Sequence, residues 1–446
     1  MRHSKLLIGL AAVLVVAGFA WVRHVDNNLR TCEPDASGEK DTCTAAIDSG
    51  FFSGDALAQI HIQRGNAVFQ KREFDLALVD YEEAARIAPN ASGLHRAMGD
   101  ALRAKGDYAK AVDQYNEALR LEPETGGSYF GRGAIYLSQG DLDRAVPDLS
   151  SAIRVFPNFA PAYELRGEAF LGKGDLVNAI DDFNETIRLD PKNAQAYGGR
   201  GFAYARVNDL VRAMADFNES IRLDPQNSDF HWGRGAAYAQ NDDFDRALAD
   251  FKESLRLNPQ NAAAYYARGY AYFYGDDLGA AISDYDEAIR FDPKNAEYHL
   301  FRGIARFYSG DVSAARADFI RERELDPKDA YSAIWDDIVA RHNGEESRLS
   351  EAVSAIDMTA WPAPVIRALL QQTATAGTLA TAADADEKKR MDQTCEADFY
   401  SGEMALRQKD KAEARRLFRR AVDGCRKYNI ETVAARAELK TLDAAP

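Results

Sequence analysis

The chain has 446 residues, of which 46% are apolar and 28% charged, so it is long and apolar enough to fold around a core. Its 70 acidic residues outnumber its 55 basic residues, and the net charge of −15 argues against a protein that binds nucleic acid through the phosphate backbone. Four cysteines are too few for a disulfide scaffold and too widely spaced for a zinc module.

The chain begins with an apolar segment. Arg2 and Lys5 precede an uncharged run over residues 6–22, and Arg23 follows it. A helix of this length spans about 25 Å, which is shorter than the ~30 Å core of a membrane but longer than most secretory signal cores. Residues 1–23 are therefore expected to be a retained signal anchor or a cleaved signal peptide, and no cysteine follows that would make a lipoprotein anchor.

After an expected exported linker with a short capping helix, residues 24–57, a period of 34 residues organises the chain. A proline, a glycine and an alanine each recur at this interval, which is typical of stacked repeats. Small and apolar residues follow helical spacing on both sides of a polar turn, so each unit predicts two antiparallel helices. Eight units run over residues 58–329, and their prolines are Pro89, Pro123, Pro157, Pro191, Pro225, Pro259, Pro293 and Pro327.

The repeats resemble the tetratricopeptide repeat (TPR) family. This resemblance covers residues 58–329 and implies an all-α fold, a right-handed TPR superhelical solenoid of antiparallel helix pairs. It further implies that the first helices of the repeats line a concave groove that receives a peptide or a protein, and it implies neither a reaction nor a cofactor. The matching residues in one repeat are Tyr265, Gly269, Tyr272, Ala281, Tyr285, Ala288 and Pro293.

Seven of the eight repeats carry an arginine at their seventh position and an aspartate at their twenty-third. The remaining repeat has Met98 and Gln114 there, so the two positions change together. Because both positions lie at nearly the same level of an antiparallel hairpin, an ion pair is the simpler interpretation, and a row of anion-binding arginines is the alternative. The expected pairs are Arg64–Asp80, Arg132–Asp148, Arg166–Asp182, Arg200–Asp216, Arg234–Asp250, Arg268–Asp284 and Arg302–Asp318.

No catalytic or metal-binding residue is predicted. The sequence has no Gly-rich phosphate loop after a strand and no nucleophile arrangement, so we expect a protein that is not an enzyme. Four of the seven histidines replace a packing tyrosine at the fourth repeat position, without a cysteine or carboxylate at ligand spacing. These histidines are His61, His95, His231 and His299.

Positions 5, 9, 12 and 13 of each first helix are expected to line the groove. In the first four repeats they are mostly polar, as at Arg96, Asp100 and Arg103. In the last four they are largely aromatic, and such a surface must be covered by the chain's own C-terminal segment or by a protein or peptide partner. This predicted partner-binding surface, the aromatic surface, consists of Phe202, Trp232, Tyr266, Tyr270, Phe273, Tyr274, Phe307 and Tyr308.

Beyond residue 329 the sequence no longer follows the 34-residue period. Residues 330–371 predict a degenerate helical repeat, and residues 372–387 form an Ala- and Thr-rich linker. Residues 388–446 predict a TPR-like helical hairpin followed by a capping helix.

The cysteines fall into two local pairs. Cys395 and Cys425 open and close the C-terminal hairpin, whose antiparallel helices would bring them together, and Cys32 and Cys43 bracket a short loop. Two disulfides formed in an oxidising compartment are therefore expected, with four free thiols as the alternative.

The closing segment resembles the tail of bacterial envelope repeat proteins related to the lipoprotein NlpI, on the runs "WPAPVIRALL", "CEADFYSGE" and "AARAELKTL". This resemblance implies an adaptor of the cell envelope.

The sequence thus predicts a non-enzymatic protein–protein interaction scaffold of the bacterial cell envelope, either anchored in the cytoplasmic membrane with its repeats in the periplasm or soluble there. The alternatives are a regulatory subunit of an envelope hydrolase or protease complex and a self-associating assembly factor. The sequence determines neither the partner nor the oligomeric state.

Overall fold

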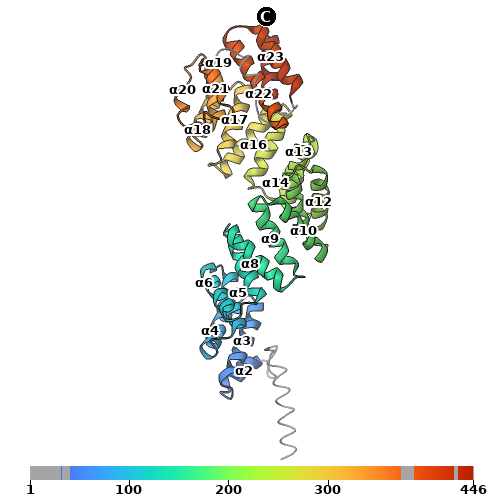
Figure 1. Cartoon of the computed structure of the whole chain (residues 1–446), viewed down its shortest axis with the longest axis vertical. Helices are drawn as coiled ribbons and strands as arrows, with labels where there is room; N and C mark the ends of the chain where they lie inside the picture. Colours follow the sequence, from blue (N-terminus) through green and yellow to red (C-terminus); the bar gives the residue numbers. More distant parts are fainter. Residues whose placement is uncertain (1–31, 33–40, 373–385, 426–429, 445–446) are drawn as a thin grey trace, which may run out of the picture. The chain divides into compact units, whose positions relative to one another are not determined.

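The computed structural model describes residue 32 and residues 41–372, 386–425 and 430–444, and its regular elements are helices (Figure 1). The expected membrane segment, residues 1–23, and nearly all of the Ala- and Thr-rich linker lie outside the described residues. Within the described residues, no helix is both long and apolar enough to cross a membrane. The chain divides into two compact units, residues 1–207 and 208–446, a division that the constant period does not indicate.

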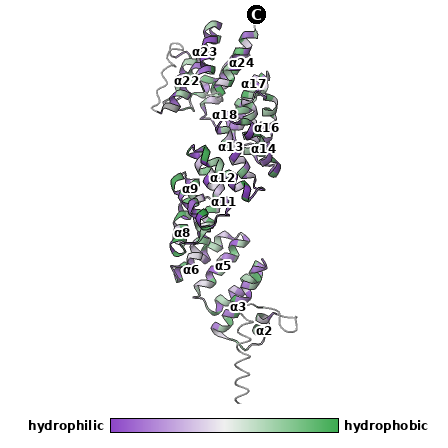
Figure 2. Cartoon of the chain, turned by 90° about the vertical axis from the view of Figure 1, so that its right-hand side faces the viewer, coloured by the Kyte–Doolittle hydropathy of each residue, from purple (hydrophilic) through white to green (hydrophobic). Residues whose placement is uncertain are grey.

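The first unit consists of a short helix and successive helical hairpins. Helices α3 and α4 form the first hairpin, α5 and α6, α7 and α8, and α9 and α10 form the next three, and each hairpin packs against the one before it. The helices carry hydrophilic and hydrophobic residues alike, as expected where one face of each is buried (Figure 2). Their bounds are α2 Thr42–Asp48, α3 Gly54–Gln70, α4 Phe74–Ile87, α5 Ser92–Lys105, α6 Tyr108–Leu121, α7 Gly126–Ser138, α8 Leu142–Val155, α9 Ala160–Lys173, α10 Leu176–Leu189 and α11 Ala194–Arg206.

The second unit continues the hairpins and ends in a different arrangement. Helices α13 and α14, α15 and α16, and α17 and α18 form the last three repeats. The expected degenerate repeat consists of α19, a helix α20 of only 4 residues, and α21. The bounds are α12 Leu210–Leu223, α13 Ser228–Gln240, α14 Phe244–Leu257, α15 Ala262–Tyr274, α16 Leu278–Phe291, α17 Ala296–Tyr308, α18 Val312–Leu325, α19 Ala330–His342, α20 Leu349–Ala352, α21 Ala363–Leu369, α22 Glu387–Arg407, α23 Lys411–Gly424 and α24 Ile430–Ala444.

Local sequence sets the turn inside each repeat. A residue of this turn adopts a left-handed backbone: φ is 84° at Gly106 and 78° at Gly174, directly after their helices, and 66° at Asp276, the second residue after α15. Glycine adopts this conformation freely and aspartate tolerates it. In the last of these turns, the carboxylate of the next residue, Asp277, accepts the backbone N–H of Ala280 at 3.1 Å and so caps the second helix. The short polar turn thus ends one helix and begins the next.

The recurring glycine at the eighth repeat position lies against an aromatic ring of the paired helix. A Cβ atom at Gly235 would lie 2.8 Å from the Phe251 ring, and one at Gly99 would lie 2.7 Å from the Tyr115 ring. Both rings are buried. Glycine is therefore needed at these positions because any side chain would force the two helices apart.

The arginine–aspartate pairs that lie within one unit form as predicted. Arg166 donates through Nε and Nη2 to the two carboxylate oxygens of Asp182 at 2.8 and 2.7 Å. In the repeat that lacks the pair, Gln114 instead lies 2.8 Å from His95 Nδ1. The guanidinium groups are already engaged by buried carboxylates, which favours the ion-pair interpretation over a row of anion-binding arginines. The pairs are Arg64–Asp80, Arg132–Asp148, Arg166–Asp182, Arg234–Asp250, Arg268–Asp284 and Arg302–Asp318.

Candidate partner-binding surfaces

The aromatic surface lies mostly in the second unit, where its rings pack on one another. The Tyr270 ring centroid is 4.4 Å from that of Tyr274 and 6.3 Å from that of Tyr266. Phe273, Tyr274 and Phe307 are only 0%, 6% and 9% exposed. Neighbouring helices of the same chain therefore cover these three residues.

The other members of the aromatic surface are half-buried. Phe202 belongs to the first unit. Trp232 packs in a separate apolar cluster with Ala247 and Phe251. Tyr308 lies beside the C-terminal helices, with its hydroxyl group buried. The partner-binding role assigned to these residues stays a prediction.

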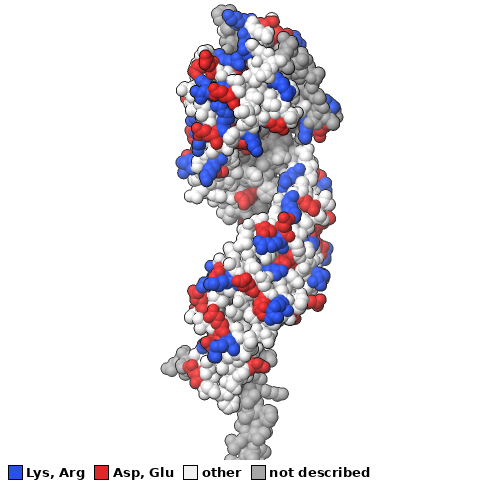
Figure 3. Space-filling model, turned by 60° about the vertical axis from the view of Figure 1, so that its left-hand side comes forward, with Lys and Arg blue, Asp and Glu red and all other residues white. Residues whose placement is uncertain are grey.

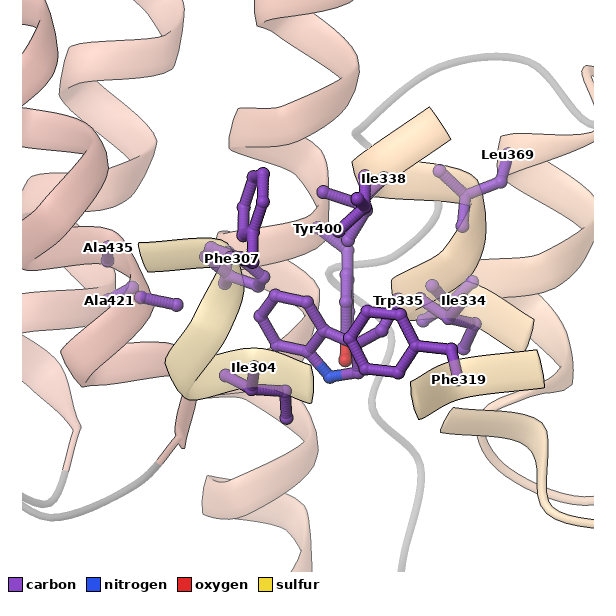
Figure 4. Packing of buried hydrophobic residues seen from close by; sticks show 14 of the residues in the cluster. Ile304, Phe307, Phe319, Ile334, Trp335, Ile338, Leu369, Tyr400, Ala421 and Ala435 are labelled. Atoms are coloured by element: carbon purple, nitrogen blue, oxygen red, sulfur yellow. The ribbon is translucent and has the colours of Figure 1, made fainter. Parts of the chain in front are cut away.

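The chain's own C-terminal segment covers the aromatic face of the last repeats. The Trp335 ring of α19 lies 6.2 Å from the Tyr308 ring on one side and 5.6 Å from the Phe399 ring of α22 on the other. Figure 4 shows Phe307 and Trp335 close to Tyr400 of α22. One apolar cluster therefore joins the repeats to the C-terminal helices.

The last helix, α24, also belongs to this cover. Ala435 and Leu442 are part of the same apolar cluster as Tyr274 of α15. At the edge, Lys440 forms an ion pair with Asp276, in the turn after α15, at 2.7 Å. Of the two alternatives for covering the aromatic surface, the structure shows the chain's own C-terminal segment over repeats seven and eight.

A half-buried carboxylate and a cysteine pair connect the C-terminal helices to their neighbours. Glu396 of α22 accepts hydrogen bonds from Trp361 Nε1 at 2.7 Å and from the Tyr331 hydroxyl at 3.0 Å. Burial raises the pKa of Glu396, and these two hydrogen bonds oppose the rise. The sulfur atoms of Cys395 and Cys425 are 2.11 Å apart, the arrangement of a disulfide.

The second predicted cysteine pair has the same arrangement. The sulfur atoms of Cys32 and Cys43 are 1.91 Å apart, and their Cα atoms are 5.0 Å apart. The structure therefore places both pairs where the sequence predicts them.

A hollow of about 790 Å³ opens on the first-helix face of the first three repeats. Its polar wall consists of Arg96, Asp100 and Arg103, residues of the polar half of the predicted groove. Arg96 pairs with Asp100 at 3.0 Å, and the Nε atom of Arg103 is buried without a hydrogen-bond partner among the described residues. Guanidinium groups on this wall could pair with a bound acidic group.

The opposite wall of this hollow is aromatic. Phe130 of α7 and Phe159, before α9, lie edge to face with their ring centroids 5.0 Å apart. Phe156 and Phe159 remain 49% and 36% exposed. Large exposed rings beside a polar wall are typical of protein recognition surfaces. We call Phe130, Phe156, Phe159, Arg96 and Arg103 together the first-unit hollow.

Sequence reasoning restricted to four positions of the first helix did not include Phe156 and Phe159. The sequence marks these two phenylalanines only by their difference from the residues at the same positions of the later repeats. Where Phe159 stands, the next repeat has Asn193, whose side chain accepts the backbone N–H of Ala196 at 2.9 Å and caps α11. Phe159 occupies the N-cap position of α9 and makes no such bond. A stabilising cap is thus replaced by an exposed ring.

Elsewhere, charges of both signs share the surface. On the face seen in Figure 3, Lys and Arg are interspersed with Asp and Glu. Many are paired one turn apart on the same helix, such as Arg188 with Glu185 at 2.6 Å. Such a mixed face does not provide the positive surface that phosphate backbones require.

The comparisons with known proteins identify the repeats. The tetratricopeptide repeat model matches residues 96–158, 135–194, 167–228 and 233–296. No curated protein matches the chain.

Three solved structures illustrate the similarity to known repeat proteins. The anaphase-promoting complex hetero-tetramer Cut9–Hcn1 is 17% identical over 66% of this chain, with a TM-score of 0.49, and this chain spans only 59% of its length. A tetratricopeptide repeat protein from Parabacteroides merdae is 18% identical over 56% of this chain and 98% of its own, with a TM-score of 0.46. PilF from Pseudomonas aeruginosa is 20% identical over 48% of this chain and 97% of its own, with a TM-score of 0.43. Given the matches to the repeat model and the helical hairpins found there, residues 96–228 and 233–296 carry tetratricopeptide repeats.

Proposed function

We propose that the protein is a non-enzymatic scaffold that binds a segment of another protein in the first-unit hollow. The observation that carries this proposal is the pair of exposed phenylalanines, Phe156 and Phe159, at the turn before α9. Later repeats place polar residues at the same positions, so the rings are not a requirement of the repeat fold. Tetratricopeptide repeats commonly act by binding, which supports the same conclusion.

The two walls of the hollow define the chemistry of the bound segment. An aliphatic or aromatic side chain would pack against the exposed faces of Phe156 and Phe159. An acidic group of the same segment would pair with the guanidinium group of Arg103, which lines the hollow. The proposed ligand is therefore a peptide segment with an apolar side chain close to an aspartate or glutamate.

The same proposal places the scaffold outside the cytoplasm of a bacterium, attached to or released from the cytoplasmic membrane. Its support is the apolar run at residues 6–22, the two cysteine pairs, and the resemblance of the tail to envelope repeat proteins. N-terminal sequencing of the protein from its native membrane fraction separates the two forms, since an anchor keeps residues 1–23 and a signal peptide loses them.

Selection of a random peptide library on the purified full-length protein tests the binding site. We expect selected peptides to combine an apolar residue with a nearby acidic residue. The double variant Phe156→Ala/Phe159→Ala should weaken their binding at least tenfold in fluorescence anisotropy, because rings of this kind dominate binding energy. Arg103→Gln should weaken it as well, and more so for peptides with the acidic residue.

A matched control removes an exposed apolar side chain elsewhere in the same unit. Val177 of α10 is 71% exposed and lies outside the hollow, so Val177→Ala should leave peptide affinity unchanged. Peptides whose affinity is the same for the wild type and the double phenylalanine variant would show that the hollow is not the recognition site.

A further inference from the structure

Three potential metal ligands converge where the C-terminal helices meet. His342 lies at the end of α19, Glu403 on α22 and Glu438 on α24. One nitrogen of the histidine and one oxygen of each carboxyl group all lie within 4.8 Å of one another. His342 Nε2 and Glu403 Oε2 are already 2.9 Å apart. Three separate helices therefore contribute one donor atom each to the same point.

One oxygen atom of the Glu403 carboxylate has no hydrogen-bond partner among the described residues. Glu403 is only 7% exposed, and its Oε1 atom is buried without a hydrogen-bond partner among the described residues. A buried carboxylate oxygen without a partner is costly, and it indicates a missing ligand or ion. Glu438 is also buried, so both carboxyl groups are held away from bulk water.

The site is reachable from solvent. His342 and Glu403 line a cavity of about 420 Å³, and the His342 side chain is 31% exposed. The cavity therefore leaves room for a water molecule to complete the coordination of an ion held by the three side chains.

The positive charges in this cavity are engaged elsewhere. Arg341 pairs with Asp337 through Nη2 at 2.6 Å, and Arg407 donates to the backbone oxygen of Leu369 at 3.0 Å. Two buried carboxyl groups therefore face one histidine, and a divalent cation bound there would offset their charges.

We infer that His342, Glu403 and Glu438 form a binding site for a divalent transition-metal ion, with Zn²⁺ as the best match. Zn²⁺ accepts both imidazole nitrogen and carboxylate oxygen as ligands, and it commonly takes three protein ligands with water in the fourth position. Mg²⁺ and Ca²⁺ prefer oxygen donors alone, and the absence of thiolate among these three ligands disfavours Cu⁺. The ion would tie α19 to α22 and α24, and so hold the C-terminal segment over the repeats.

The sequence analysis predicted no metal site and did not single out these residues. They are separated by 61 and 35 positions, as read from the sequence, so no ligand-spacing motif marks them. Only the packing of α22 and α24 beside α19 brings them together.

Calorimetric titration of the full-length, tag-free protein with ZnCl₂, after removal of metals by EDTA, tests the inference. We expect one Zn²⁺ per chain and a higher melting temperature with zinc, since an ion that binds only the folded chain stabilises it. His342→Ala and Glu438→Gln should each weaken zinc binding more than about 100-fold, because loss of outer-shell partners alone costs 10- to 100-fold.

Two controls distinguish the site from general binding. Glu413→Gln removes an exposed carboxylate of α23, and His95→Asn removes a histidine of the first unit. Both should bind zinc as the wild type does. Glu438→Gln keeps the His342–Glu403 pair, so circular dichroism in EDTA should show it folded. Failure of the wild type to take up one Zn²⁺, or equal uptake by the ligand variants, would overturn the inference.

Discussion

Phe159 stands at the N-cap position of α9, where asparagine caps the corresponding helices of the later repeats. The variant Phe159→Asn should therefore raise the free energy of unfolding by about 1 kcal/mol, since a side-chain cap contributes that much. The same variant should weaken binding of peptides selected on the wild type, because it removes one wall of the first-unit hollow. Urea denaturation and fluorescence anisotropy measure the two effects.

The second repeat offers a matched control for this trade of stability against binding. Ala91 occupies the N-cap position of α5, also without a side-chain cap, and is not part of the hollow. Ala91→Asn should stabilise the protein to a similar extent and leave peptide affinity unchanged. Equal peptide affinity in the Phe159→Asn variant would contradict the role given to this ring.

The arginine–aspartate pairs should behave as coupled units. Asp182 is buried, so Arg166→Met should leave an uncompensated carboxylate and destabilise the protein by roughly 3 kcal/mol. The second repeat carries methionine and glutamine at these positions and folds in the same way. Adding Asp182→Gln should therefore recover much of the loss. Unfolding free energies of the four members of this cycle give the coupling, and strictly additive losses would refute it.

At the scale of elements, the junction of α18 with α19 contains a buried carboxyl group. Glu322 stands where the other repeats have alanine, serine or threonine, and burial raises its pKa from 4.5 to about 8. Between these two values, the folded chain keeps a proton that the unfolded chain has released. The free energy of unfolding should therefore fall as the pH rises from about 4.5 to about 8.

Glu322→Gln should remove this dependence, because glutamine does not titrate. We expect the variant to gain on the order of 1 kcal/mol relative to the wild type for each pH unit within that window. Thermal or urea unfolding between pH 5 and pH 9 measures the difference. Glu324 lies on the same helix but is largely exposed, so Glu324→Gln should follow the wild type. A parallel pH profile for Glu322→Gln would show that the carboxyl group is not protonated in the folded protein.

At the scale of the whole molecule, the two cysteine pairs bear on the compartment in which the protein works, because disulfides persist in oxidising compartments. Mass spectrometry of non-reduced peptides should find Cys32 linked to Cys43 and Cys395 linked to Cys425 in protein from its native source. A bridge that closes a loop of 30 residues contributes roughly 3 to 4 kcal/mol. Reduction should therefore speed hydrogen exchange in α22, α23 and α24 before it affects the repeats of the first unit. Four alkylatable thiols would contradict both the pairing and the proposed location.

Local patterns were sufficient to predict the repeated part of this fold. The period of 34 residues gives the helix pairs, and the joint change at Met98 and Gln114 reveals the ion pairs. Both are contacts between neighbouring helices, which recur in every repeat and therefore leave a regular signal.

Contacts formed once leave no such signal. The hydrogen bond from Trp361 to Glu396 and the meeting of His342 with Glu438 each depend on how the C-terminal helices pack. The burial of Phe273 and Phe307 follows from the same packing. The first-unit hollow was missed for a different reason, because Phe159 lies in a turn and not on the first-helix face.

The cover formed by α19 to α24 also limits how many helical hairpins can stack on one another. If the stack of hairpins ended at Leu325, the apolar side of its last helix would be exposed to solvent. Phe319 packs on that side. A second copy of the chain could dock there head to tail and continue the stack into a filament, since such a contact does not close on itself. Trp335 and the helices behind it occupy that side within the same molecule. The C-terminal segment thus acts as a terminator that keeps the number of stacked hairpins equal to the number encoded in one chain.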